Sequence, residues 1–224
     1  MVSNVLGMAE REGAKMKPKQ PRAEHCAYLT PENVYSALWK WWDSQQHMPD
    51  PGSLRWLDPA CGDGRLLHKP YCDGAQVFGF DIRPECEKSF NNIGKHFVLV
   101  DDSLQMKWPE NTEIIMNPPF GTRSNDLAGK FMRKMISHCT VNRRWGVALQ
   151  LSSVLQAKRR GDIRLPDYKL DLTWRPQFES TKAMSGGYFK DFSWFVYSPT
   201  PTGTCKTYRL RKDGHGIEQN TGDT

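Results

Sequence analysis

The apolar residues of this chain gather into short runs that are bounded by glycine, proline or polar residues. Runs of this length predict buried β-strands. The earlier runs each end at an acidic or amide residue: 54–57 before Asp58, 77–80 before Asp81, 97–100 before Asp101 and Asp102, and 114–116 before Asn117. Because open α/β sheets bind ligands at the carboxyl ends of their strands, this pattern predicts a ligand site at one sheet edge.

Helical patterns and further strands complete the α/β prediction. Thr30 and Pro31 predict the start of a helix, as N-cap and first-turn proline, that runs to about residue 44. Another helix is predicted after Pro84, and one over about 127–138, where apolar side chains recur on one face. Later apolar or alternating segments predict strands at 145–151, 169–174 and 193–197, the last two forming an antiparallel hairpin.

The loop after the first predicted strand, 58–64, is built mainly from small residues (DPACGDG). Gly62 and Gly64 allow positive φ and a close approach of a ligand to the backbone. Asp81 ends the second predicted strand about 20 residues later, where dinucleotide-binding folds place the acid that holds ribose hydroxyls. The loop and this acid together predict a site for a ribose-containing cofactor.

The segment Asn117-Pro118-Pro119-Phe120 follows the strand predicted at 114–116. The asparagine side-chain oxygen can accept an N–H donor, and the prolines keep the loop extended. Phe120 adds a flat surface, on which stacking of a base is worth roughly 1–3 kcal/mol. These residues predict a clamp for an exocyclic amino group on a planar ring.

Together these motifs resemble those of S-adenosylmethionine-dependent amino-methyltransferases, of the kind that methylates adenine N6 or cytosine N4 in DNA. DPACGDG is similar to that family's cofactor loop, and NPPF is one form of its catalytic motif. Their order, with no long insert between them, is similar to the gamma group, which favours adenine. The resemblance covers 25–150 well and 150–198 loosely, and it implies a Rossmann-like seven-stranded sheet with a terminal antiparallel hairpin and helices on both faces.

The resemblance also implies which residues form the site. Asn117, Pro118, Pro119 and Phe120 would be catalytic, with the target base flipped out of the duplex and stacked on Phe120. S-adenosylmethionine would be held by Asn117 and by residues of four other segments: Tyr28, Thr30 and Pro31; Asp58, Pro59, Ala60, Cys61, Gly62 and Gly64; Asp81 and Ile82; and Asp101 and Asp102.

Basic and aromatic residues in the second half of the chain are candidates for contact with the nucleic acid. The cluster Lys158, Arg159 and Arg160 would contact phosphates, although a solvated helix end would explain it equally well. The resemblance implies a second aromatic against the flipped base, for which Phe178 is the first candidate and Phe189 the second; packing alone also explains either. A net charge of +6 suits a polyanionic partner.

Composition outside the motifs predicts one catalytic domain with polar ends. We expect a flexible basic arm over 1–24, the catalytic domain over 25–198, and a disordered polar tail over 199–224. The chain has neither a long apolar stretch nor a secretory signal, so we expect a cytoplasmic protein without a membrane partner. The six cysteines lack zinc-site spacing, which predicts reduced thiols and no metal.

The short segment after the last predicted strand leaves alternatives open. DNA methyltransferases with this motif order usually append a large recognition domain, so recognition would come from a partner subunit or from a second copy in a homodimer. RNA adenine methyltransferases share NPPF and can be compact, whereas protein glutamine methyltransferases usually carry Tyr in place of Phe120. A non-catalytic nucleic-acid-binding subunit would be expected to have a damaged loop or clamp. We therefore expect adenine-N6 methyl transfer to DNA, with RNA as the main alternative.

Overall fold

The computed structural model describes residues 29–90, 97–99, 102–120, 125–156, 158–178 and 191–219. Its strands are β1 (Arg55–Asp58), β2 (Gln76–Asp81), β3 (Phe97–Leu99), β4 (Glu113–Met116), β5 (Gly146–Leu151), β6 (Tyr168–Leu172), β7 (Phe192–Tyr197), β8 (Lys206–Leu210) and β9 (Gly216–Gln219). Its α-helices are α1 (Glu32–Ser44), α2 (His68–Cys72), α3 (Cys86–Phe90) and α4 (Leu127–Asn142). Short 3-10 turns are η1 (Pro51–Ser53), η2 (Arg65–Leu67), η3 (Val154–Gln156) and η4 (Lys158–Arg160).

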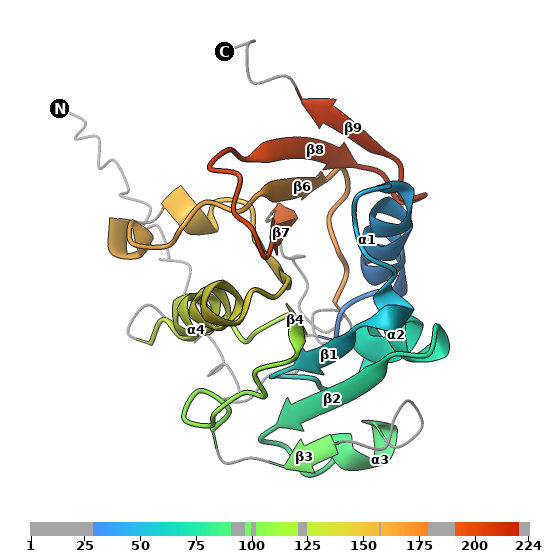
Figure 1. The fold of residues 1–224 in the computed structure, drawn as a ribbon, viewed down its shortest axis with the longest axis vertical. Helices are drawn as coiled ribbons and strands as arrows, with labels where there is room; N and C mark the ends of the chain where they lie inside the picture. The colour runs from blue at the N-terminus through green and yellow to red at the C-terminus, as the bar shows by residue number, and fades with distance from the viewer. Residues whose placement is uncertain are drawn as a thin grey trace, which may run out of the picture.

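All described strands belong to one sheet with the order β3-β2-β1-β4-β5-β7-β6-β8-β9 (Figure 1). Strands β1 to β5 pair in parallel, and β7 lies antiparallel between β5 and β6. The predicted Rossmann-like sheet with an antiparallel hairpin is therefore confirmed. The described sheet has nine strands instead of the predicted seven, so the hairpin does not end it. The strand order reverses between β1 and β4, which lie side by side at the centre of the parallel part.

Two apolar clusters cover the two faces of this sheet, because successive side chains of a strand point to opposite sides. On β4, Ile115 packs in the cluster with α1, whereas Ile114 and Met116 pack in the cluster with α4. Figure 1 shows α1 and α4 on opposite sides of the sheet. The helices predicted near the start of the chain and over 127–138 are thus confirmed, and α4 continues to Asn142.

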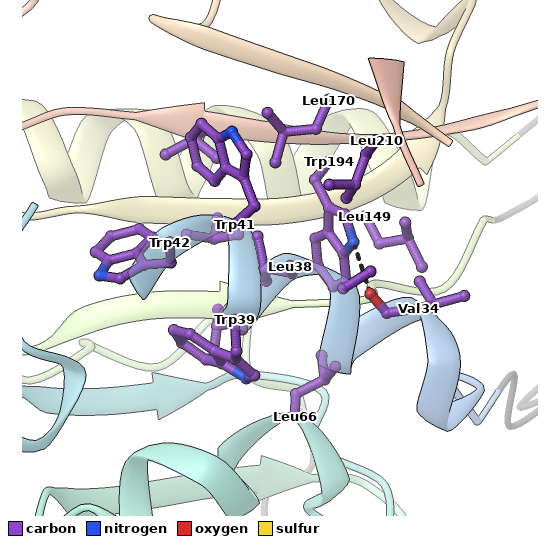
Figure 2. Close-up of a cluster of buried hydrophobic side chains, with 14 of the residues drawn as sticks. Val34, Leu38, Trp39, Trp41, Trp42, Leu66, Leu149, Leu170, Trp194 and Leu210 are labelled. Atoms are coloured by element: carbon purple, nitrogen blue, oxygen red, sulfur yellow. Dashed lines mark hydrogen bonds between the residues drawn. The ribbon is translucent and has the colours of Figure 1, made fainter. Parts of the chain in front are cut away.

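Helix α1 is fixed by tryptophans on its buried side (Figure 2). Trp39 packs edge-on against Trp56 of β1, with ring centroids 5.3 Å apart. From β7, the indole of Trp194 donates a hydrogen bond of 3.3 Å to the carbonyl of Val34. These contacts hold the first residues of α1 over the sheet, close to the carboxyl ends of the parallel strands.

The start of α1 differs from the prediction that the Thr30 side chain caps it. The helix begins at Glu32, Pro31 occupies the N-cap position, and no side chain caps the helix there. The Thr30 hydroxyl instead contacts a residue of the site described below. A threonine before Pro-Glu is locally an acceptable cap, but the tertiary contact takes its hydroxyl.

The segment after residue 198 also differs from the prediction, because it extends the sheet. Strand β8 pairs in parallel with β6, and β9 pairs antiparallel with β8. Tyr208 of β8 packs against Trp41 of α1, with centroids 5.6 Å apart. The expectation of a disordered tail is therefore wrong for residues 206–219. Only alternate residues of β8 are apolar, so its composition resembles that of a solvated segment.

None of the helices in the described ranges combines the length and the apolar character that a bilayer-crossing helix needs.

Candidate active site

A pocket of about 350 Å³ lies at the carboxyl ends of the parallel strands, beside the reversal of strand order between β1 and β4. Such positions are the usual ligand sites of open α/β sheets. The volume falls in the range of small-molecule sites. The predicted site residues on its wall are Thr30, Asp58, Pro59, Ala60, Cys61, Gly62, Asp81, Ile82, Asp102, Asn117, Pro118 and Pro119. The fold thus brings five separate segments of the sequence to one cavity.

Some predicted residues do not lie on this wall. Pro31 lines a neighbouring pocket, and Gly64 and Phe120 are not among the residues that line either pocket. Tyr28, Asp101 and Phe189 lie outside the described residues, as does the side chain of Arg159.

Other wall residues are not predicted by the sequence motifs. They are Leu29, Asp63, Arg65, Leu66, Arg83, Ser103, Leu104, Asn125, Leu127 and Phe131. Most of them are close neighbours of motif residues, so wider windows around each motif would have found them. Phe131 on α4 is different, because its position in an amphipathic helix indicates only a core residue.

The glycine loop folds onto the end of β2 through its backbone. Gly62 has φ of 56° and donates its N–H to Asp81 Oδ2 at 2.8 Å. A Cβ on Gly62 would lie 3.3 Å from Leu29 Cδ2, closer than ordinary contact, so the loop also packs tightly beneath the N-terminal segment. Gly64 has φ of 82° and starts the turn into η2. These left-handed conformations explain why glycine is needed at both positions.

Asp81 is the acceptor at the centre of this arrangement. Besides the bond from Gly62, it accepts two bonds from the Arg83 guanidinium, each 2.9 Å long, and one of 3.0 Å from the Arg83 backbone N–H. Burial by itself raises the pKa of the Asp81 carboxyl, but the hydrogen bonds and charge of Arg83 outweigh it, so the pKa is lowered. Asp81 is therefore an ionised carboxylate, and a ligand hydroxyl that binds it must compete with the donors that it already accepts.

Asp58 ends β1 on the opposite side of the loop and is 1% exposed. Its Oδ1 accepts the N–H of Ala60 at 3.0 Å, which shapes the first turn of the loop. Burial raises the pKa of this carboxyl, the Ala60 N–H opposes the rise, and the nearby Asp81 and Asp63 add to it. Asp102 provides a further acidic group on the wall. This lining suits a ligand that carries hydroxyls and positive charge.

Asn117 follows β4 and reaches the same pocket from the other side. Its Nδ2 donates a hydrogen bond of 3.0 Å to the Oγ1 of Thr30. The carbonyl of Thr30 in turn accepts a bond of 3.1 Å from Arg65, which also pairs with Asp63 of the glycine loop. The orientation of the Asn117 amide is thus tied to the loop through Thr30 and Arg65. This link is the main polar feature that joins the two predicted motifs.

Phe120 lies against an aromatic group rather than on the pocket wall. Its ring centroid is 5.6 Å from that of Phe192 and 6.4 Å from that of Phe178. Phe178 is only 1% exposed. The prediction that Phe178 stacks against a substrate base is therefore corrected, because its ring supports Phe120 and offers no open face.

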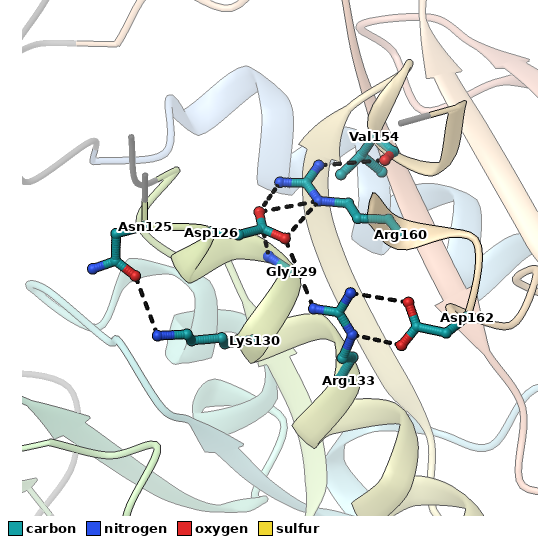
Figure 3. Close-up of polar contacts among 8 residues, drawn as sticks. All are labelled: Asn125, Asp126, Gly129, Lys130, Arg133, Val154, Arg160 and Asp162. Carbon is teal, nitrogen blue, oxygen red and sulfur yellow. Dashed lines mark hydrogen bonds and ion pairs between the residues drawn. The ribbon is translucent and has the colours of Figure 1, made fainter. Parts of the chain in front are cut away.

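Two residues of the predicted phosphate-contacting cluster lie in different environments. Lys158 is exposed, but Arg160 is buried and its Nε lies 3.1 and 3.2 Å from the two carboxylate oxygens of Asp126 (Figure 3). Arg160 also donates to the carbonyl of Val154 at 3.3 Å. Asp126 is the N-cap of α4 and accepts the N–H of Gly129 at 3.3 Å. Arg160 is thus a structural residue that fixes the start of α4, and its predicted role in phosphate binding is wrong.

We expect Arg160→Ala to lower the free energy of unfolding by about 3 kcal/mol, because it removes a buried guanidinium and leaves the partly buried Asp126 carboxylate without its main partner. Lys158→Ala, close to it in the sequence but exposed, should leave stability almost unchanged. Urea denaturation of both variants measures this difference. Equal stability of the two variants would contradict the structural role of Arg160.

Comparison with known proteins gives the fold. No protein-family model matches the sequence, and no curated protein matches it. Among solved structures, the type I restriction-modification system methyltransferase subunit from Streptococcus thermophilus superposes with a TM-score of 0.57 at 14% identity, over 86% of this chain and 50% of that one. A putative RNA methyltransferase from Pyrococcus horikoshii superposes with a TM-score of 0.59 at 17% identity, over 82% of this chain and 92% of that one.

These identities are low, so the likeness concerns the fold alone. The chain spans half the length of the restriction-modification subunit and nearly the whole of the archaeal protein. The chain therefore has the Rossmann-like methyltransferase fold.

Proposed function

We propose that this chain is an S-adenosylmethionine-dependent methyltransferase that acts on the N6 amino group of adenine in nucleic acid, with DNA as the first candidate. The observation that carries the proposal is the Asn117–Thr30 hydrogen bond. It holds the amide of the NPPF segment on the wall of the pocket that the glycine loop and Asp81 also line. One cavity thus combines the features of a cofactor site with a clamp for an amino group.

The residues of the pocket fit the proposed cofactor. Asp81 is an ionised acceptor suited to ribose hydroxyls, and Ile82 is 44% exposed, which offers an apolar surface to an adenine ring. The acidic residue Asp102 on the wall favours a ligand with positively charged sulfonium and ammonium groups. Gly62 lets the ligand approach the backbone closely.

The bound cofactor supplies an electrophilic methyl group, and the protein orients the amino group toward it. The Asn117 side-chain oxygen and the Pro118 carbonyl accept its two N–H bonds, which draws the nitrogen toward sp³ geometry and makes its lone pair available. Phe120, held by Phe178 and Phe192, supports the flipped base by stacking. No general base is required beforehand, because the proton leaves easily after transfer. The rate gain comes from orientation and preorganised hydrogen bonds.

The choice between DNA and RNA rests on different observations. The resemblance of the motifs to DNA amino-methyltransferases and the restriction-modification neighbour favour DNA, with recognition supplied by a partner subunit or a second copy. The coverage of 92% of the archaeal putative RNA methyltransferase favours RNA as the second candidate, because that protein is equally compact. A non-catalytic subunit is a weaker alternative, since the loop and the clamp are both intact.

Methyl-labelled S-adenosylmethionine tests the proposal directly. The purified protein is incubated with duplex DNA, single-stranded DNA, total RNA or protein extract, and the labelled product is then digested and identified. We expect label in N6-methyldeoxyadenosine. Label in RNA only would support the second candidate. Absence of cofactor binding in calorimetry would contradict the proposed function as a whole.

A second test concerns the residue that positions Asn117. We expect Thr30→Val to lower kcat by about tenfold with little change in the KM for the nucleic acid, because the variant removes one hydrogen bond that orients the amide. Thr30→Ser keeps the hydroxyl and should restore kcat. Steady-state kinetics of Thr30→Val and Thr30→Ser distinguish a positioning role from general instability. A structural defect would change both kcat and KM, whereas a positioning role predicts that Thr30→Ser restores kcat. An unchanged kcat in Thr30→Val would contradict this role.

A further inference from the structure

A second pocket, of about 740 Å³, adjoins the proposed cofactor pocket, and Asp63 and Arg65 lie on the walls of both. Its other walls come from the first turns of α1, the segment after β6, and the turn between β8 and β9. The residues that matter below are Tyr35, Trp174, Arg175, Gln177 and Lys212. The NPPF segment does not line this cavity, and the glycine loop contributes only Asp63 to it.

The lining of this second pocket combines aromatic rings with cationic groups. Tyr35 and Trp174 are half-buried, so each offers part of a ring to the cavity. Arg175 and Lys212 are exposed at its mouth. Arg175 pairs with Asp191 at 3.6 Å, and that pair is solvent-exposed and therefore weak. Asp63, on the shared wall, is already neutralised by Arg65.

This combination selects a ligand class. Aromatic side chains beside a basic track bind unpaired nucleic acid, because bases stack on the rings and phosphates meet the cations. A small metabolite would not need cations spread from the β6 segment to the β8–β9 turn.

The second pocket is also connected to the proposed clamp through the chain. Trp174, Arg175 and Gln177 line the pocket, and the next residue, Phe178, packs against the ring of Phe120. The segment after β6 therefore runs from the second pocket to the aromatic support of the clamp. This segment would therefore lie beside the nucleotides next to a target base held at Phe120.

We propose that the second pocket binds an unpaired nucleotide of the substrate strand beside the target base, with Trp174 as the stacking surface and Arg175 and Lys212 near the phosphates. The adjacency to a target base rests on the proposed function, whereas the affinity for single strands does not. Strands β8 and β9 then have a defined purpose. They place Lys212 at the pocket, where it contributes to binding of the strand.

Fluorescence anisotropy with labelled oligothymidylate and oligouridylate of about ten nucleotides tests this proposal, since such lengths fit one single-strand site. Neither probe contains adenine, so binding is measured without methyl transfer. We expect Lys212→Glu to weaken binding about tenfold at low salt and to reduce the salt dependence by about one phosphate contact. Trp174→Leu should weaken binding about tenfold by removing the stacking surface.

Lys206→Glu is the matched control. Lys206 is an exposed lysine of β8 outside the pocket, and its replacement changes the net charge by the same amount. It should alter the affinity by less than about twofold, because it removes only long-range attraction. Lys212 lies in an exposed turn, so its variant stays informative even if Trp174→Leu does not fold. Equal losses for Lys212→Glu and Lys206→Glu would overturn the proposal, as would tighter binding of duplex DNA than of either single strand.

Calorimetry with S-adenosylmethionine separates this inference from the proposed function. If the protein binds S-adenosylmethionine, and Lys212→Glu and Trp174→Leu bind single strands as tightly as the wild type, the inference is refuted and the proposed function stands. Pocket-dependent strand binding without cofactor binding would refute the proposed function alone. A preference for oligothymidylate or for oligouridylate would in addition indicate which polymer the pocket accepts.

Discussion

Replacing Asn117 with alanine is expected to lower the turnover of methyl transfer by roughly 10²–10³-fold, the usual cost of removing one preorganised hydrogen-bonding group at a reacting atom. The variant loses the oxygen that draws the target nitrogen toward sp³ geometry. It should leave the Kd for S-adenosylmethionine within about threefold, because the glycine loop and Asp81 are untouched. Single-turnover kinetics with saturating cofactor, combined with calorimetry, measures the two effects separately.

Asn125→Ala is the matched control for this experiment. Asn125 lies on the wall of the same pocket, but its side-chain oxygen accepts a bond of 3.3 Å from Lys130 of α4. We expect this variant to retain most of the turnover. Wild-type turnover in Asn117→Ala would disprove the proposed mechanism. Similar losses in both asparagine variants would show that the pocket wall as a whole, and not the clamp, is needed.

Replacing Asp81 with alanine is expected to have the second large effect, on both cofactor binding and stability. The change leaves the Arg83 guanidinium and the Gly62 N–H without their shared acceptor. Because the Asp81 side chain is only 5% exposed, the free energy of unfolding should fall by on the order of 3 kcal/mol. The loss of a charged acceptor for the ribose should raise the Kd for S-adenosylmethionine about 10- to 100-fold.

Asp162→Ala provides the comparison for the stability part. Asp162 forms a similar two-bond pair with Arg133, at 2.7 and 2.9 Å, but it lies at the surface (Figure 3). Its removal should leave both the unfolding midpoint and cofactor affinity almost unchanged. Calorimetry and urea denaturation of the two variants measure the contrast. An unchanged Kd in Asp81→Ala would exclude Asp81 as a ribose ligand, whatever its effect on stability.

The hydrogen bonds that Asp81 already accepts also limit how a ribose can bind to it. Gly62 and Arg83 together donate four hydrogen bonds to the Asp81 carboxylate. These four donors fill the lone-pair positions of the two carboxylate oxygens. A ribose can bind this carboxylate only if one of these donors gives way. The guanidinium of Arg83 is the donor that can move, because the other two are backbone groups of fixed loops.

Much of the candidate site could be predicted from the sequence because it depends on local signals. Strands are recognisable as apolar runs, and each positions the residue that follows it at the same edge of a parallel sheet. That rule alone predicts that Asp58, Asp81, Asp102 and Asn117 lie close together, and all of them line the cofactor pocket. The glycines of the loop are predictable for a similar reason, since only glycine readily adopts their positive φ.

The partners of polar side chains could not be predicted, because they come from distant parts of the chain. Thr30 has the local features of a helix cap, yet its hydroxyl bonds to Asn117, which no sequence spacing indicates. Arg160 belongs to a basic cluster that looks solvated, yet it is buried against Asp126. The local sequence allows Thr30 to cap the helix or to bond elsewhere, and allows Arg160 to be solvated or buried. In both cases a contact with a distant residue decides between the two.

The sequence by itself determined the α/β class, the parallel strands and the meeting of the motifs at one edge, because periodicity and strand ends are local properties. Only the tertiary structure decided the rest. Strands β8 and β9 form because β6 offers an open edge and α1 offers Trp41, although their own apolar content is too small to predict a strand. The second pocket likewise exists only where α1, the β6 segment and the β8–β9 turn meet, so no single stretch of sequence carries its signal.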